Sequence, residues 1–149
     1  MSNHWNEVTL TNSRLLYIED DYLSGHWQKC DEKLFHFIET NPKLRLYGDR
    51  TILYFFADTS TIWVGREVIG HVGNLPSGLE FYDVSKGMAL EVPLQKMWFD
   101  LNLGEVHHEG LKNLQEISKQ TQKLATTWRL VFDWSSDVPK IAFNYFFLI

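Results

Sequence analysis

The sequence is poor in cysteine and in long apolar runs. Cys30 is the only cysteine among 149 residues, which excludes an internal disulfide bond and a cysteine-based zinc site. No apolar segment approaches the ~18 residues of a membrane-spanning helix. The first ten residues, MSNHWNEVTL, lack the basic start and apolar core of a signal peptide. We therefore predict a cytoplasmic protein that does not enter a membrane.

Basic residues are also scarce. Lys and Arg number 14 against 19 Asp and Glu, which gives a formal net charge of −5 at pH 7. Nucleic-acid binding needs clustered Lys and Arg that displace counterions from phosphates, so we predict no nucleic-acid partner. The acidic balance is typical of a soluble protein, and it also suits a basic protein partner.

Motifs that name a reaction are missing. No serine occupies a G-x-S-x-G elbow, and Gly65, Gly70 and Gly73 are not followed by the Lys-Ser/Thr of a phosphate loop. Cys30 falls on an apolar helix stripe, where we expect it to pack as a small apolar side chain rather than act as a nucleophile. The sequence therefore assigns no catalytic residue, no metal site and no cofactor. The sequence favours a protein that is not an enzyme, but it does not decide whether the protein has catalytic activity.

Aromatic side chains, in contrast, are abundant. They make up 15% of the chain, with Phe 10, Trp 6 and Tyr 6. Large rings fill a core with much area per residue, and they also anchor binding surfaces. We expect one domain over residues 1–149, which is long enough to bury a core without disulfides, and we expect some rings to stay partly exposed.

Two segments show the three- and four-residue spacing of an amphipathic helix. The first runs from about Asp20 to Pro42, with acids at its start and a proline at its end. Gly25 in its first turns is unfavourable in a helix, so a later start is the alternative. The second runs from about Gly110 to Ala125, with lysines opposite its apolar stripe. The stripes are Leu23, Trp27, Cys30, Leu34 and Ile38 in the first segment, and Leu111, Leu114, Ile117, Thr121, Leu124 and Ala125 in the second.

Most of the remaining chain is strand-like. Two short strands are expected near 8–10 and 14–18, and about five lie between 44 and 101, joined by connections too short for parallel crossovers. The pattern predicts a meander, with hairpins at GDR (48–50) and at SSDVP (135–139). We predict an α+β fold, in which a single antiparallel curved sheet of about six to eight strands carries two helices on one face.

Residues 105–110, EVHHEG, gather four potential metal ligands. Adjacent side chains diverge by about 100° on a helix and point to opposite faces of a strand, so His107 and His108 cannot converge on one ion. We interpret the stretch as the polar start of the second helix. If that helix begins early, His107 joins the stripe of Leu111 and Leu114, and His108 faces outward.

The final segment, AFNYFFLI, carries large apolar side chains on both of its alternating sides. One side can face the helices, but the other needs a second cover. That cover could be a ligand pocket formed by curvature of the sheet, a dimer interface or a partner protein. A strand at the centre of a fully buried sheet would show the same pattern.

The C-terminal quarter resembles a known family. It comprises LKNLQEISKQTQKL, then TWRLVFDW opened by Trp128, then AFNYFF. This order resembles the C-terminal end of YezG-type immunity proteins, small acidic α+β proteins that neutralise a partner toxin by binding it. Phe146 and Phe147 stand where that group usually has acids after its final tyrosine. The resemblance therefore implies a binding role, and no functional residue is carried over.

The first hypothesis is a non-catalytic protein-binding domain. It would be an immunity or antitoxin-like inhibitor of a partner toxin, or a self-associating protein. An acidic surface suits the basic groove of a nuclease toxin through charge complementarity. The candidate partner-binding residues are Glu19, Asp20, Asp21, Asp31, Glu32, Glu105, His108 and Glu109.

The alternative is a small-ligand pocket protein, or a hydrolase-like enzyme, with an aromatic-lined cavity in the curved sheet. A His–Asp pair in such a cavity could act as a general base, although a strand histidine with its own hydrogen bond is the simpler explanation of His71. The candidate pocket residues are Trp63, His71, Tyr82, Asp83 and Trp98.

Overall fold

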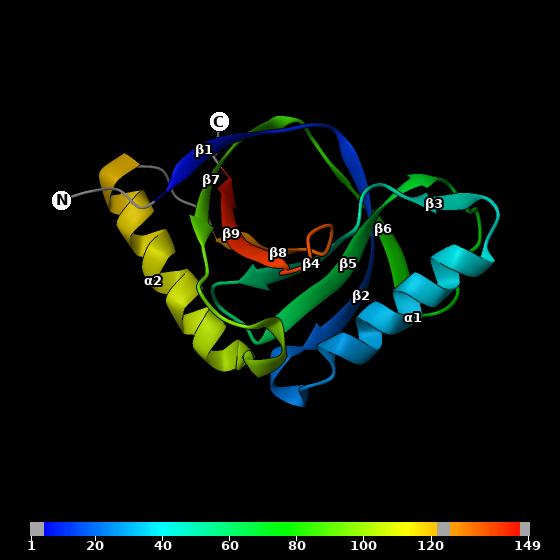
Figure 1. Ribbon diagram of the computed structural model, residues 1–149, viewed down its shortest axis with the longest axis horizontal. Coiled ribbons are helices and arrows are strands. Elements are labelled where there is room, and N and C mark those ends of the chain that lie inside the picture. Colours follow the sequence, from blue (N-terminus) through cyan, green and yellow to red (C-terminus); the bar gives the residue numbers. More distant parts are fainter. Residues whose placement is uncertain (1–4, 122–125, 147–149) are drawn as a thin grey trace.

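A computed structural model describes residues 5–121 and 126–146 as one antiparallel sheet with two helices on a single face (Figure 1). The α-helices are α1 (Trp27–Thr40) and α2 (Leu103–Thr121), and the short 3-10 helices are η1 (Tyr22–Ser24) and η2 (Trp98–Asp100). The strands are β1 (Asn6–Leu10), β2 (Ser13–Asp21), β3 (Leu44–Leu46), β4 (Arg50–Phe56), β5 (Thr61–Gly70), β6 (Leu79–Val84), β7 (Gly87–Pro93), β8 (Thr127–Asp133) and β9 (Lys140–Phe146).

The predicted fold class is confirmed, with nine strands in the sheet. The strand order is β1-β7-β9-β8-β4-β5-β2-β6, and β3 pairs with β5 beyond the end of β4. The predicted hairpin between β8 and β9 is present. All strand pairs between the described residues are antiparallel.

The predicted meander is wrong, because only β4 and β5 among the five central strands pair with their sequence neighbour. The segment GDR does not form a hairpin, since β3 pairs with β5 rather than with β4. Strand β6 pairs with β2, and β7 lies between β1 and β9. Short connections indicate antiparallel strands, but they do not decide whether a strand finds its partner nearby or at the far end of the chain.

The sheet is curled, with both helices against its outer, convex face (Figure 1). Successive side chains of a strand point to opposite faces, so Leu53 and Phe55 face the helices while Ile52 and Tyr54 face inward. Tyr54 on β4 and Tyr82 on β6 lie three strands apart, roughly 14 Å in a flat sheet. Their ring centroids are only 6.0 Å apart, so the curl brings inner side chains of distant strands into contact.

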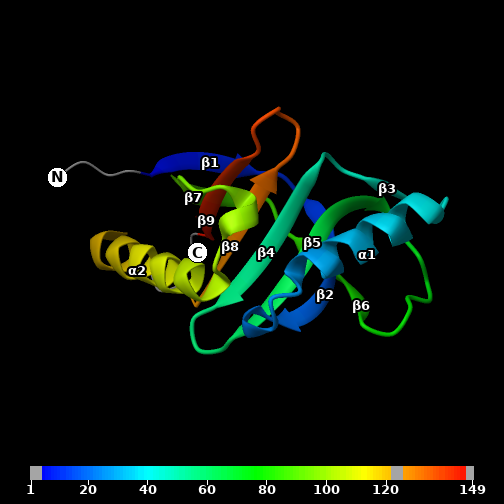
Figure 2. The same ribbon diagram turned by 60° about the horizontal axis from the view of Figure 1, so that its bottom comes forward.

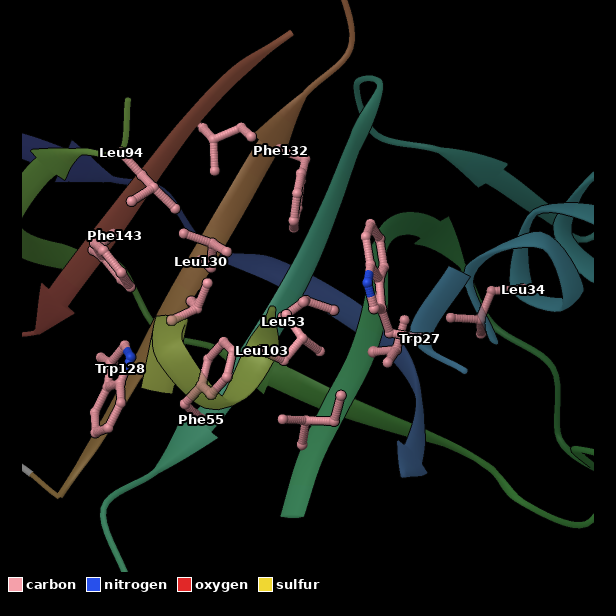
Figure 3. Packing of buried hydrophobic residues seen from close by; sticks show 14 of the residues in the cluster. Trp27, Leu34, Leu53, Phe55, Leu94, Leu103, Trp128, Leu130, Phe132 and Phe143 are labelled. Carbon is pink, nitrogen blue, oxygen red and sulfur yellow. The ribbon is translucent and has the colours of Figure 1, made fainter. Parts of the chain in front are cut away.

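The main hydrophobic core lies between the outer face and the helices (Figure 3). Trp27 of α1 stacks on Phe132 at 4.9 Å between ring centroids, and Phe55 stacks on Trp128 at 5.9 Å. Figure 2 shows α1 and α2 lying over different parts of this face. The buried side chains that the helices contribute are Trp27, Leu34, Ile38, Leu103, Val106, Leu114 and Ile117.

Helix α1 begins at Trp27, later than the expected start at Asp20. Asp21 instead accepts a hydrogen bond from the Leu23 backbone N–H at 2.8 Å and caps η1, which Gly25 ends in the left-handed conformation with φ 72°. Leu23 was expected on the buried stripe, but it is 75% exposed because it belongs to η1. Cys30 packs against the core as predicted, and burial followed by the charge of Asp20 raises the pKa of its thiol to about 11.

Helix α2 begins at Leu103, seven residues before the predicted start at Gly110. Asn102 Oδ1 accepts a hydrogen bond from the Glu105 backbone N–H at 3.1 Å, which is the capping interaction that begins the helix. The segment 105–110 therefore lies inside the first turns of α2 rather than ahead of them. The helix extends to Thr121, and Leu124 and Ala125 lie outside the described residues. Neither helix in the described parts of the chain is long and apolar enough to cross a membrane.

A buried ion pair fixes α1 to the sheet. Arg66 of β5 is 6% exposed, and its Nε and Nη2 donate to the two carboxylate oxygens of Asp31 at 2.8 and 3.0 Å. Its Nη1 reaches Asp49 at 3.2 Å, and Thr51 donates to Asp31 at 2.9 Å. A bidentate pair with every oxygen engaged holds the helix in one register and angle.

We expect Asp31→Asn to destabilise the fold by about 3 kcal/mol, because it removes the bidentate partner of the buried Arg66 guanidinium and leaves Asp49, which is 53% exposed, as its counter-charge. Urea unfolding followed by circular dichroism measures this loss. Asp83→Asn is the matched control, since Asp83 pairs with Arg14 at 2.8 Å while 70% exposed. That control should unfold at nearly the wild-type urea concentration, and equal losses in the two variants would contradict the structural role of Asp31.

Candidate ligand-binding site on the inner face

Six rings gather on the inner face, and we name them the inner aromatic cluster. Tyr17 and Trp63 stack with centroids 4.2 Å apart, and Trp63 meets Tyr82 edge to face at 5.4 Å. Tyr54 stacks on Phe146 at 6.2 Å with the two planes only 9° apart. The cluster therefore joins β2, β4, β5, β6 and β9, and its members are Tyr17, Tyr54, Phe56, Trp63, Tyr82 and Phe146.

The inner aromatic cluster has a buried base and an open rim. Tyr17 and Tyr54 are 8% and 3% exposed, whereas Tyr82 is 43% exposed and Trp63 is half-buried. Burial, followed by the hydrogen bond that Tyr17 donates to Glu80 at 2.9 Å, raises the pKa of the Tyr17 phenol to about 12. The rings at the rim can contact a ligand while those below hold them in place.

The first cavity at this cluster, here the Trp63 cavity, has a volume of about 330 Å³. Trp63 and Phe56 supply its aromatic surface, and its charged residues are two carboxylates, Glu19 and Asp58. Trp63 Nε1 donates to Glu19 at 3.3 Å, which orients the indole beside the carboxylate. The complete lining is Glu19, Phe56, Ala57, Asp58, Thr59, Thr61, Trp63 and Thr126.

The second cavity, here the Arg129 cavity, has a volume of about 200 Å³ and the opposite charge. Arg129 and Glu67 are 2% and 4% exposed, and Arg50 forms an ion pair with Glu67. Arg129 Nε donates to Asn144 Oδ1 at 3.0 Å. The complete lining is Thr9, Leu10, Thr11, Ser13, Tyr47, Arg50, Glu67, Val84 and Arg129.

The two cavities lie at opposite ends of β4. Arg50 lines the Arg129 cavity, and Phe56, six residues later, lines the Trp63 cavity. Roughly 20 Å of extended strand separates these two residues, and Arg129 pairs with Tyr54 between them. Between them, Ile52 and Tyr54 are buried in the second apolar cluster. The inner face is thus dry at its middle, acidic at one end and basic at the other.

Two of the five predicted pocket residues, Trp63 and Tyr82, meet in the inner aromatic cluster. His71 and Asp83 lie elsewhere, and each contacts Arg14, at 3.2 and 2.8 Å. Arg14 therefore occupies the carboxylate that a His–Asp pair would need. The cavity of about 460 Å³ beside Arg14 and Asp83 is larger, but Tyr47 is the one aromatic residue in its lining.

The fifth predicted pocket residue, Trp98, belongs to η2 and lies on the helix side of the molecule. Its ring meets Phe99 and Trp134 edge to face, with centroids 5.6 and 5.5 Å away. Trp98 borders a separate groove of about 330 Å³ between η1 and the starts of α1 and α2. It therefore takes no part in the inner aromatic cluster.

The predicted partner-binding residues come from β2, α1 and α2. Glu19 lies in the Trp63 cavity, Asp21 caps η1, and Asp31 is committed to Arg66. Asp20 accepts a hydrogen bond from Ser24 Oγ at 3.1 Å. Of the remaining four, Glu32, Glu105 and His108 are exposed and Glu109 is half-buried.

The two adjacent histidines diverge as the spacing requires. His107 is half-buried, with its Nε2 2.9 Å from the Phe56 backbone oxygen and its ring 5.3 Å from that of Trp128. His108 is exposed on the opposite side of α2. Over residues 5–121 and 126–146, no three His, Cys, Asp or Glu side chains are arranged to hold a metal ion.

The sequence pattern did not identify Arg50, Glu67 and Arg129 as site residues. A signal was nevertheless present, because WRLVF and GREVIG each place charged residues inside an otherwise apolar strand. A charge in a strand that is apolar on both sides must be paired or face a cavity. Arg66 meets this rule by pairing with Asp31, and Arg129 meets it by lining a cavity.

Comparison with known proteins identifies the fold. No family model and no curated protein matches the chain. The crystal structure of the EcmrR C-terminal domain matches with a TM-score of 0.69 and 11% identity, over 95% of each chain. EcmrR in its DNA complex matches with a TM-score of 0.68 and 10% identity over 95% of this chain, which spans 56% of that one. The structure of SAV2435 bound to tetraphenylphosphonium matches with a TM-score of 0.58 and 11% identity, over 97% of this chain and 93% of that one.

We expect Tyr17→Phe to be less stable than the wild type near neutral pH, because it loses the hydrogen bond to Glu80. This difference should shrink between about pH 10 and pH 12. A phenol with a folded pKa of about 12 contributes stability that is complete below its unfolded pKa near 10 and is lost as the pH rises above it. Urea unfolding at each pH measures the difference, with Tyr47→Phe as an exposed control. A constant difference would show that Tyr17 does not titrate in this way.

Proposed function

We propose that the protein binds a small aromatic organic cation in the Trp63 cavity. The observation that carries this proposal is the pairing of aromatic surface, from Trp63 and Phe56, with two carboxylates and no basic side chain in one lining. A volume of about 330 Å³ falls at the lower end of the ~300–1,000 Å³ that small-molecule pockets occupy.

The chemistry of the lining favours a cation over a neutral aromatic molecule. The face of an indole attracts a positive charge, by ~0.5–1 kcal/mol at exposed sites and ~2 kcal/mol or more where water is excluded. Glu19, held beside the indole by the Trp63 hydrogen bond, adds a negative charge in contact with that face. A ligand with both an aromatic surface and a positive charge satisfies both groups at once.

Two comparisons are consistent with this proposal. SAV2435, which has the same fold, is bound to tetraphenylphosphonium, a cation with four aromatic rings. The EcmrR C-terminal domain corresponds to nearly this whole chain, so a domain of this fold also occurs as one part of a larger protein. The DNA complex is a property of EcmrR, and a net charge of −5 argues against direct DNA contact by this chain.

The toxin-inhibitor hypothesis stays a prediction. Within its candidate set, the Asp31 carboxylate is already bound to Arg66, so a partner would have to use the remaining acids. Co-purification with the catalytic domain of a toxin encoded beside this protein would support it. A small molecule in the Trp63 cavity accounts for the aromatic rim directly, and for this reason we favour the ligand-binding function.

Tetraphenylphosphonium is the first probe to test, by isothermal titration calorimetry against the wild-type chain. Trp63→Leu should weaken its binding at least about tenfold, because the variant loses the indole face that the cation contacts. Trp98→Leu is the matched control, since it removes the same side chain from the groove beside η2. The control should bind as the wild type does.

Two results would contradict the proposal. One is the absence of measurable binding by the folded wild-type chain to tetraphenylphosphonium and to a panel of smaller aromatic ammonium ions. The other is equal affinity in Trp63→Leu and the wild type, which would place the ligand elsewhere. A melting curve for each variant confirms that the fold is intact in the protein whose binding is measured.

A further inference from the structure

Arg129 carries a charge that the described protein does not neutralise. Its side chain is 2% exposed, and within residues 5–121 and 126–146 no carboxylate lies at ion-pair distance from its guanidinium. Its Nε donates to a neutral group, the Asn144 amide oxygen, at 3.0 Å. The guanidinium also lies 5.3 Å from the centre of the Phe146 ring. Neither contact supplies a negative charge.

The surrounding cavity leaves this charge uncompensated. Glu67 is the one carboxylate in its lining, and the ion pair with Arg50 engages it. The formal charges of Arg50, Glu67 and Arg129 therefore sum to +1. A buried charge is unfavourable unless it is paired, so a buried arginine without a counter-charge marks a place where an anion would be stabilising.

The geometry of the guanidinium defines the kind of anion. Nε is bound to Asn144 and the Tyr54 hydroxyl lies beside the guanidinium, so the remaining Nη N–H groups are the donors open to a ligand. Two parallel N–H donors match the two oxygens of a carboxylate. Four hydroxyl-bearing residues, Thr9, Thr11, Ser13 and Tyr47, complete the polar part of the lining. Volume limits the ligand as well, because about 200 Å³ is below the ~300 Å³ of pockets for drug-sized molecules.

We propose that the Arg129 cavity is an anion site that binds the carboxylate of a small organic acid. The site is separate from the Trp63 cavity, at the other end of β4, and it stands whether or not that cavity accepts a cation. Bulky cations are excluded from it by charge, since it presents two guanidinium groups against one carboxylate. Binding brings the missing negative charge to Arg129.

Three probes of matched size test this site: benzoate, its neutral analogue benzamide, and the cation benzylamine. Calorimetric titration of the wild-type chain at neutral pH should show benzoate binding at least about tenfold more tightly than benzamide, and added benzylamine should not weaken benzoate binding, because the cation does not compete for this cavity. Arg129→Gln should abolish the preference for benzoate, because it removes the charge and keeps an amide donor. Arg14→Gln, which removes an arginine outside this cavity, should leave that preference unchanged.

A second measurement avoids the risk that Arg129→Gln fails to fold. In the wild-type protein, the Nε–H resonance of Arg129 should shift in the nitrogen–proton NMR spectrum on addition of benzoate and not of benzamide. The inference is overturned by an unshifted Arg129 resonance, by equal affinity for benzoate and benzamide, or by a benzoate preference that survives in folded Arg129→Gln. A chain that binds tetraphenylphosphonium but not benzoate would keep the function proposed for the Trp63 cavity and reject this one.

Discussion

The curl of the sheet is the constraint on which the rest of this structure depends. Both helices pack on the outer face, so within residues 5–121 and 126–146 the large side chains of the inner face are covered by the sheet itself. Curvature lets Tyr54 on β4 reach Tyr82 on β6 across three strands. Gly65 assists at the tightest point, because a Cβ there would lie 2.7 Å from the Leu15 side chain of the neighbouring strand. Along the middle of the inner face the curl closes a small second core, and at the two ends of β4 it leaves cavities.

Two buried arginines show how differently the same side chain can be paired on the two faces of the sheet. Arg66 faces α1, and the bidentate contact with Asp31 satisfies its charge, so it positions a helix and has little left to offer a ligand. Arg129 faces inward, where Asn144 supplies only an amide oxygen. An uncompensated charge is expensive in an apolar setting, and it persists beside a cavity because water or a ligand can approach it there.

The helices and the fold class could be predicted because they depend on local spacing. The apolar positions Trp27, Leu34 and Ile38 specify which face of α1 is buried, and the doubly apolar strands indicate a sheet that needs cover on both sides. Strand order could not be predicted in the same way. Pairing of β7 with β1 and β9 joins segments from the two ends of the chain, and no local pattern records it. The start of α2 was placed at about Gly110 because the regular apolar stripe begins at Leu111, although Asn102 caps the helix seven residues earlier, at Leu103.

The candidate site could also be predicted from the sequence only in part. Trp63 and Tyr82 were recognisable as inward-facing rings, but Arg129 and Glu67 acquire meaning only when the curl places them around one cavity. The positions of the charged residues along the strands then determine the charge at each end of the inner face. Strand β4 begins at Arg50 beside the basic cavity and ends at Phe56 beside the acidic one, while its buried middle keeps the two apart. Because Arg129 packs on Phe146, itself a member of the inner aromatic cluster, the basic end is built against the same rings that support the acidic end. The two proposed sites therefore differ in charge according to the end of the inner face at which each one lies.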